Sequence, residues 1–301
     1  MSAVTLTCSL PLPGNFRAVE FLDFHRRDAA QFAERVEDQV LHKGMSWRGL
    51  PACLAIALQA GRAVVRLAID GPLAPGDPVM LERTVRRMLG LDQPIDAFEA
   101  ACRSHPQLGP LIARRPGLRV PCAATPFEAL TWAVTGQQIS VGAALSIRRR
   151  LIEAAGLRHS GGLACYPDAR RLASMDEEVL RQAGFSRTKT QTLKALSQHV
   201  DRGLLPLDAW ADAPPPEEIR ARLLAFRGVG PWTVSYVLLR GFGWLDGSLH
   251  GDVAVRRKLQ ALLACPEAVT EVAARRWLME FSPWRALVAA HLWLMDTPSG
   301  G

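Results

Sequence analysis

The sequence predicts a mainly α-helical protein that begins with an α+β domain. Strand-like alternation of apolar and polar residues occurs near the N-terminus, whereas helical periodicity dominates from about residue 111 onward. The 301 residues are enough for two or three domains with a sizeable core. We expect an α+β domain over 1–110, a helical domain over 111–230 that ends in a helical hairpin, and a C-terminal helical segment over 231–301.

The N-terminal domain carries the strand signals. Every second residue from Val4 to Leu10 is apolar, so this segment presents one apolar face, as a strand does. Two further apolar segments flank the dipeptide Ala60-Gly61, a pattern typical of a β-hairpin. Helical patterns follow at about 77–90 and 94–104.

Capping residues mark several helix starts in the second half of the chain. Thr125 and Glu128 flank a proline and predict a capping box. The segment GQQIS interrupts the helix that follows, and the pattern resumes at VGAALSIRRRLIEAAG. Ser174 and Glu177 predict a second capping box, and Ser186 can cap the next helix.

Composition excludes several classes of protein. The six cysteines are widely scattered and no CxxC pair occurs, so the sequence indicates neither a zinc site nor an iron–sulfur cluster. No secretory leader is evident, and no apolar run is long enough to span a membrane. We expect a soluble, cytoplasmic, monomeric protein with no membrane partner and no required cofactor.

The charge balance favours a polyanionic partner. The chain carries 36 Lys plus Arg against 29 Asp plus Glu, a net charge of +7. Basic residues cluster at 114–115, 148–150, 187–189 and 256–258. Each cluster alone is typical of a solvated helix face, but their recurrence favours nucleic acid as the partner.

The segment from Leu223 to Asp252 carries the strongest functional signal. A helical pattern runs into the turn GVGP at 228–231, and a second helical pattern leaves it. Glycine permits a close backbone approach, and proline suits the first turn of a helix. Unpaired amides at a helix start bind anions such as phosphate. A plain interhelical turn can have the same sequence, so the turn alone does not define a function.

A glycine-rich loop follows and ends at Asp252, directly before a segment with the pattern of a basic helix. Asp252 fits an N-cap, a role that needs no further function. The helix dipole favours a negative charge there. Such a carboxylate can stabilise the positive charge that develops on a sugar as a glycosidic bond breaks, and can orient or deprotonate water. Asp246, in the middle of the loop, fits a turn residue better.

The chain resembles the helix-hairpin-helix and Gly/Pro–Asp superfamily of DNA glycosylases, most closely the 3-methyladenine DNA glycosylase II family of alkylation repair. The resemblance rests on FRGVGPWT with Asp252, and on the segments RPGLRVP, FEALTWAVTGQQIS, GFSRTKTQTL and SPWRALVAAHLWLM in similar order and spacing. It covers nearly the whole chain. It implies a TATA-binding-protein-like N-terminal domain followed by helical helix-hairpin-helix glycosylase domains.

The resemblance also implies the site residues. It places the catalytic aspartate at Asp252 and an aromatic base pocket at Trp232, Tyr236 and Trp293, which Phe24 can close from the N-terminal domain. Electron-rich rings attract N-alkylated purines, which carry positive charge. Members that also nick the strand use a lysine where this chain has Trp232, so a monofunctional hydrolase is implied. Without this context each aromatic residue is more typical of a helix core than of a pocket.

Duplex DNA with damaged bases is the implied partner. The turn Gly228-Val229-Gly230 would hold a backbone phosphate, and Gln138 would fill the gap left by a flipped base. Arg187 and Lys189 are candidates for further phosphate contacts, although ordinary solvated helix ends have the same pattern. In related hairpins main-chain carbonyls bind Na+ or K+. The matching positions are Leu224, Phe226 and Val229.

Three departures from the family pattern bear on substrate range. Gln138 stands where many relatives carry a bulky apolar residue, Val253 where some carry a pocket tyrosine, and His250 where a proline is expected. The predicted activity is excision of bases such as 3-methyladenine and 7-methylguanine in base excision repair. The alternatives are a glycosylase of the same fold for deaminated or oxidised bases, and a lesion-binding protein without turnover. A metal hydrolase is disfavoured, because no carboxylate or histidine cluster is apparent.

Overall fold

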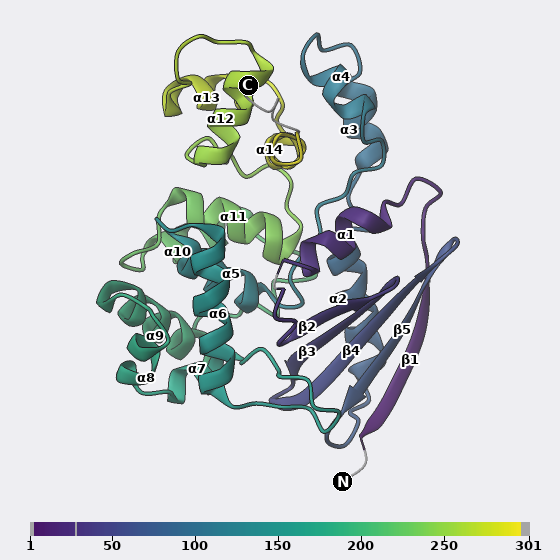
Figure 1. Ribbon diagram of the computed structural model, residues 1–301, viewed down its shortest axis with the longest axis vertical. Coiled ribbons are helices and arrows are strands. Elements are labelled where there is room, and N and C mark those ends of the chain that lie inside the picture. Colours follow the sequence, from purple (N-terminus) through teal and green to yellow (C-terminus); the bar gives the residue numbers. More distant parts are fainter. Residues whose placement is uncertain (1–2, 28, 296–301) are drawn as a thin grey trace.

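Five strands form one antiparallel sheet near the N-terminus (Figure 1). The computed structural model describes residues 3–27 and 29–295, and in it the strands run in the order β1-β5-β4-β3-β2. The strands are β1 (Val4–Pro11), β2 (Glu34–Glu37), β3 (Val40–Trp47), β4 (Leu50–Gln59) and β5 (Arg62–Ile69). The hairpin expected at Gly61 joins β4 to β5 and is confirmed.

The sheet buries one face in a core of its own. Alternate residues of β4 and β5, such as Leu54 and Val65, are fully buried in this core. The helices α1 (Ala18–His25) and α2 (Asp77–Leu89) contribute apolar side chains to it. The apolar face of the strands, which repeats every two residues, thus packs against the apolar faces of the helices, which repeat every 3.6 residues.

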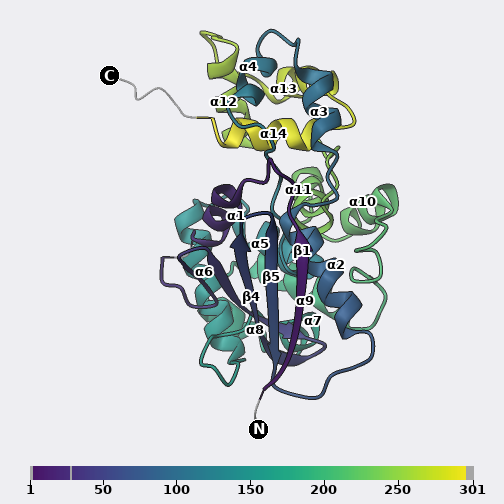
Figure 2. The ribbon, with the colours of Figure 1, turned by 90° about the vertical axis from the view of Figure 1, so that its right-hand side faces the viewer.

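Two short helices leave the sheet and join the C-terminal helices (Figures 1 and 2). The group consists of α3 (Ile95–Cys102), α4 (Leu108–Ala113), α12 (Val253–Leu262), α13 (Glu271–Met279) and α14 (Arg285–Trp293). The ring of Phe98 lies 5.9 Å from that of Trp284 and 5.5 Å from that of His291, measured between centroids. The domain boundary expected near residue 110 therefore falls within α4, which shares the core of the helical half.

Seven helices of the described residues form a helical body that lies beside the sheet (Figure 1). They are α5 (Pro126–Gly136), α6 (Val141–Ala155), α7 (Ala169–Ser174), α8 (Glu177–Gln182), α9 (Arg187–Asp201), α10 (Pro216–Leu224) and α11 (Pro231–Phe242). Buried residues of α5, α9 and α11 belong to one hydrophobic core that continues into α12 and α14. The predicted helical hairpin is α10–turn–α11. No helix in the described ranges has the length and apolar character needed to cross a bilayer.

The start of α5 is confirmed, but its capping box is only half formed. The Thr125 hydroxyl accepts a hydrogen bond from the amide of Glu128 at 3.0 Å. The Glu128 carboxylate does not return to the cap. It accepts hydrogen bonds from Lys43 at 2.7 Å and Arg148 at 2.9 Å, because two buried cations bind it more strongly than a neutral amide does.

The second predicted capping box is wrong. Ser174 is the last residue of α7, and its hydroxyl donates to the Arg171 carbonyl at 2.8 Å. The residue directly before α8 is Asp176, which therefore holds the N-cap position. The cap predicted at Ser186 is confirmed, since its hydroxyl accepts from the Lys189 amide at 3.3 Å.

Candidate active site

Asp252 is the N-cap of α12 and is half-buried at the edge of a cavity. Its Oδ1 accepts a hydrogen bond from the Val255 amide at 3.0 Å. The indole Nε1 of Trp232 donates to Oδ2 at 3.0 Å, and Nε1 of Trp293 donates to Oδ1 at 3.4 Å. Asp252 is thus both the N-cap and the acceptor of two indole N–H groups. These hydrogen bonds fix the orientation of both carboxylate oxygens.

The structure brings Trp232, Tyr236 and Trp293 together as one wall. Trp232 and Tyr236 lie one turn apart on α11, and their ring centroids are 5.4 Å apart. Trp293, the last residue of α14, has its ring centroid 6.3 Å from that of Tyr236. These rings and Asp252 line a cavity of about 580 Å³, a size typical of a small-ligand site. Phe24 of α1 lines the same cavity from the N-terminal domain.

Three arginines that the sequence analysis did not single out, Arg27, Arg119 and Arg240, also line this cavity. Arg240 lies on α11 one turn beyond Tyr236, with Cζ 4.6 Å from the Phe24 ring centroid and 5.4 Å from that of Trp293. Burial lowers the pKa of Arg240 to about 10, so the side chain remains cationic at neutral pH. Arg27 lies 4.0 Å above the Phe24 ring. The i, i+4, i+8 spacing of 232, 236 and 240 was a signal that could have identified Arg240.

The other polar residues of the glycine-rich loop have partners outside the cavity. Asp246 accepts two hydrogen bonds from Arg285, at 2.7 and 3.0 Å. His250 shares a hydrogen bond of 2.8 Å with the Ser248 hydroxyl, and burial lowers the pKa of His250. Val253 is half exposed at the first position of α12. Of the two carboxylates, Asp252 lines the cavity and Asp246 does not, and the catalytic role of Asp252 stays a prediction.

The hairpin turn exposes backbone amides next to the start of α11. Gly228 has φ of 87°, and a Cβ at this position would lie 2.5 Å from Thr192 Oγ1, so both conformation and space require glycine. The amide of Val229 donates to the Phe226 carbonyl at 3.1 Å. Within the described ranges the amides of Gly228 and Gly230 have no acceptor, which leaves them available to an anion.

The predicted cation ligands also lie around this turn. The carbonyls of Leu224, Phe226 and Val229 belong to the last residue of α10 and the turn itself. The Phe226 carbonyl keeps one lone pair after accepting from Val229. Main-chain carbonyls fit Na+ or K+, and binding of either ion stays a prediction. No group of three or more His, Cys, Asp or Glu side chains in the described part of the chain is arranged to hold a metal.

Gln138 occupies the exposed turn between α5 and α6. Its φ of 58° lies in the left-handed region, which non-glycine residues seldom adopt. Lys189 supports this turn from α9, since its Nζ donates to the carbonyls of Thr135 at 2.8 Å and Gln137 at 2.7 Å. Burial lowers the pKa of Lys189. Arg187, two residues earlier, is exposed at the first position of α9.

Gln137 links the same turn to the hairpin. Its side-chain amide donates to the Gly228 carbonyl at 2.9 Å and to the Thr233 hydroxyl at 2.8 Å. Gln137 therefore fixes the position of the Gln138 turn relative to the hairpin turn that carries the exposed amides.

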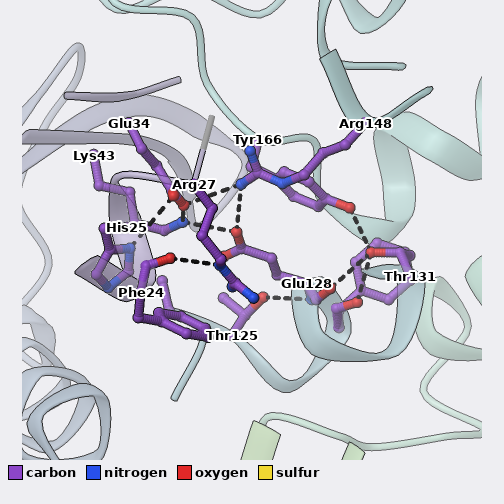
Figure 3. Close-up of polar contacts among 12 residues, drawn as sticks. Phe24, His25, Arg27, Glu34, Lys43, Thr125, Glu128, Thr131, Arg148 and Tyr166 are labelled. Carbon is purple, nitrogen blue, oxygen red and sulfur yellow. Dashed lines mark hydrogen bonds and ion pairs between the residues drawn. The ribbon is translucent and has the colours of Figure 1, made fainter. Parts of the chain in front are cut away.

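A buried ionic cluster lies beside the cavity and joins the two domains (Figure 3). Glu34 and Lys43 come from β2 and β3, and Glu128 and Arg148 come from α5 and α6. Lys43 contacts both carboxylates, and Arg148 Nη2 lies 3.0 Å from Glu34 and 2.9 Å from Glu128. A small cavity of about 40 Å³ lies between this cluster and Tyr236. The cluster thus holds the domain that carries Phe24 against the helical body.

Two family models match the chain. The AlkA N-terminal domain matches residues 7–125. The HhH-GPD superfamily base excision DNA repair protein matches residues 131–283, just over half of the chain. The chain belongs to the HhH-GPD superfamily. The predicted fold class is thereby confirmed: a mostly helical HhH-GPD protein with a five-stranded sheet domain of the AlkA type before it.

Several curated proteins are similar to this HhH-GPD chain. DNA-3-methyladenine glycosylase 2 of Escherichia coli strain K12 is 30% identical over 191 residues, which are 63% of this chain and 64% of that protein. A probable bifunctional transcriptional activator/DNA repair enzyme AlkA of Mycobacterium tuberculosis is 32% identical over 213 residues, 69% of this chain and 41% of that protein. The matched region thus spans 64% and 41% of the length of these two relatives.

Solved structures show the same HhH-GPD fold. The 3-methyladenine DNA glycosylase from Archaeoglobus fulgidus has a TM-score of 0.78 at 20% identity, with 95% of this chain and 97% of that chain covered. The 3-methyladenine DNA glycosylase of Schizosaccharomyces pombe, solved in complex with abasic DNA, has a TM-score of 0.56 at 25% identity, with 65% of this chain and 95% of that chain covered.

Proposed function

We propose that this chain is a monofunctional DNA glycosylase that hydrolyses the N-glycosidic bond of alkylated bases in duplex DNA, such as 3-methyladenine and 7-methylguanine. The observation that carries the proposal is the Asp252 carboxylate, which two indole N–H groups orient at the edge of an aromatic cavity. The names of the relatives from Escherichia coli and Mycobacterium tuberculosis support DNA repair, and the former supports alkylated bases.

The geometry suits hydrolysis through a positively charged sugar. As the bond from sugar to base breaks, positive charge develops on the sugar ring. The Asp252 carboxylate stabilises that charge and orients the water that adds to the anomeric carbon. Because the carboxylate is already held by Trp232 and Trp293, it needs little reorganisation when the charge appears.

The aromatic wall suits a base that leaves easily. An N-alkylated purine carries positive charge in the nucleoside and departs as a neutral molecule, so it needs little acid assistance. The faces of Trp232 and Tyr236 attract such a cation. Trp232 stands where strand-nicking relatives use a lysine. An indole cannot form a Schiff base, so the expected product is an abasic site in an intact strand.

The hairpin and the Gln138 turn supply the contacts to DNA. The amides of Gly228 and Gly230 hold a backbone phosphate without reading sequence, and Arg187 adds a positive charge nearby. Base flipping costs a few kcal/mol, and Gln138 offsets part of it by filling the gap in the stack. We expect the affinity for DNA to fall steeply as salt concentration rises.

The proposal is tested with methylated duplex DNA and the Asp252→Asn variant. Wild-type protein should release 3-methyladenine or 7-methylguanine, measured by chromatography, and the variant should be slower by about 100-fold or more. The variant keeps an oxygen for the Val255 cap, so it should fold. Binding to an abasic-site duplex without release of any base would contradict the proposal and favour a lesion-binding protein.

A further inference from the structure

A second cavity, of about 690 Å³, is separate from the one that Asp252 lines. Its walls come from the end of α2 and the turn after it, the loop before α10, the end of α11 and the residues just before α14. The two cavities share no lining residue. Figure 2 shows α2 and α10 on the right-hand side of the molecule, whereas α1, which lines the Asp252 cavity, lies to the left. The volume of the second cavity is typical of a small-molecule site.

Arg87 of α2 gives this cavity an uncompensated positive charge. Its Nη2 donates to the Ala124 carbonyl at 2.7 Å, and its Nε is buried without a hydrogen-bond partner. Nη1 has no acceptor among the described residues either, but it is not buried. Burial lowers the pKa of Arg87, because no carboxylate of the described residues lies within ion-pair distance to offset the loss of water.

The carboxylates on the cavity wall are already paired. Each of its three aspartates contacts an arginine, in the pairs Asp92–Arg86, Asp212–Arg83 and Asp246–Arg285. The side-chain amide of Gln93 is satisfied as well, since it donates to the Val120 carbonyl at 2.8 Å and accepts from the Val120 amide at 2.9 Å. These groups therefore leave the charge of Arg87 as the one that a ligand would meet.

Two half-buried tryptophans add apolar surface and further donors. Trp244 follows Gly243, whose φ of 71° ends α11, and Trp284 directly precedes α14. Both indoles line the cavity, and neither indole N–H has an acceptor among the described residues. The buried ring of Phe242 lies on the same wall. The cavity thus combines aromatic surface, free N–H donors and one unpaired cation.

We propose that this cavity binds a planar aromatic anion of the size of a purine mononucleotide, with its anionic group on Arg87 and its ring against Trp244 and Trp284. A guanidinium forms strong, charge-assisted hydrogen bonds with phosphate, and planar rings pack well on indoles. The proposal goes beyond the proposed function, because it concerns a site that does not hold the flipped base. Since the ligand would contact both α2 of the sheet domain and the loops of the helical half, its binding should also stabilise the folded protein.

Calorimetric titration with adenosine monophosphate (AMP) tests the proposal. Wild-type protein should bind AMP with a dissociation constant of about 1 mM or lower. Adenosine and inorganic phosphate each lack one half of the ligand, so each should bind at least about tenfold more weakly. Arg87→Met should weaken AMP binding about tenfold or more. Trp284→Phe, which keeps the ring packed on Phe98 but loses the N–H, should weaken it about threefold or more.

The matched control is Arg240→Met. Arg240 also donates to a backbone carbonyl, that of Pro121 at 2.8 Å, and its Nε is also buried without a partner, but it lines the Asp252 cavity. AMP should bind this variant as it binds wild type. Trp284→Phe and Arg87→Lys, which keeps the charge and should show an intermediate affinity, keep the test valid if Arg87→Met does not fold.

Three results would overturn the inference. The first is no binding of AMP to wild type at millimolar concentration. The second is binding that Arg240→Met weakens and Arg87→Met does not, which would place AMP in the Asp252 cavity. The third is equal binding of AMP and either adenosine or inorganic phosphate, since the site would then not recognise both halves of the ligand. Because none of these titrations measures base release, the proposed function stands or falls separately.

Discussion

Two tryptophans orient Asp252, and the shorter of the two contacts should matter more. Trp232→Phe keeps an aromatic ring and removes the N–H that donates to Oδ2 at 3.0 Å. A hydrogen bond to a charged group contributes about 1.5–3 kcal/mol. We expect single-turnover excision of 7-methylguanine to fall about 10- to 100-fold. Trp293→Phe should cost less, since its contact is 3.4 Å.

Trp284→Phe is the matched control for these variants. Trp284 packs against Phe98 and does not line the cavity with Asp252. Its excision rate should stay within about twofold of wild type. If all three variants slow excision equally, the indole contacts to Asp252 have no special role.

His291 makes stability depend on pH. Burial lowers the pKa of His291 to about 3, helped by the charges of Arg115 and Arg17, from an ordinary value of 6.5. The unfolded chain binds a proton at this residue below pH 6.5 and the folded chain does not. The contribution of His291 to stability is therefore full above pH 6.5 and is lost as pH falls. Between pH 6.5 and 5 we expect a loss of about 2 kcal/mol from this group.

Denaturant unfolding at the two pH values measures this loss. In His291→Leu the decrease in unfolding free energy on acidification should shrink by about that amount. Leu292→Met, at a buried residue of the same helix α14 that carries no titratable group, serves as the control and should keep the wild-type decrease. An unchanged pH dependence in His291→Leu would contradict the assignment.

At the scale of elements, Lys189 holds the Gln138 turn in place. Lys189→Met removes the ammonium that binds the carbonyls of Thr135 and Gln137 at the end of α5. A displaced Gln138 should fill the stack poorly, so excision from duplex DNA should slow about tenfold while excision from single-stranded DNA changes little. Fluorescence of 2-aminopurine beside the lesion measures the flipping step directly.

Lys194→Met provides a matched control on the same helix. Lys194 also binds two backbone carbonyls, those of Ala173 and Met175, but at the end of α7, away from the cavity. Lys194→Met should lower the free energy of unfolding by about as much as Lys189→Met does, but it should not change the base-flipping step. If the two variants behave alike on duplex and single-stranded DNA, Lys189 acts only on stability.

Helices, strands and turns could be predicted from the sequence where residues close together in the chain specify them. The β4–β5 hairpin, the cap of α9 at Ser186 and the hairpin around Gly228 depend on residues within a turn or two of one another. The capping boxes were less reliable. Glu128 had the right spacing to cap α5, but cations distant in the sequence attract its carboxylate.

At the scale of the whole molecule, the ionic cluster of Figure 3 joins the sheet domain to the helices. Glu128→Leu would leave Lys43 and Arg148 with one carboxylate between them, and breaking a buried pair costs about 3–5 kcal/mol. Burial alone would raise the pKa of Glu128, but these two cations lower it. Its stabilising effect is therefore present above its ordinary value of 4.5 and is lost as pH falls through the lowered pKa.

Urea unfolding of Glu128→Leu, of Lys43→Met and of the double variant Lys43→Met/Glu128→Leu tests this account. The double variant should be less destabilised than the sum of its single variants, because each partner alone leaves an unpaired charge. Glu153→Gln, an exposed glutamate on α6, should leave stability unchanged. Additive losses would mean that the cluster members do not act as one unit.

The sequence by itself determined the local chemistry of this protein: the helical hairpin with its glycines, and the carboxylate of Asp252 at the start of a helix. These features depend on backbone conformation and short-range hydrogen bonds, which a few adjacent residues specify. The resemblance already named Phe24 and Trp293 as pocket residues, but only the tertiary structure decided that Arg27 and Arg240 lie against their rings. Such contacts follow from how apolar faces pack across the whole chain, which no local pattern specifies.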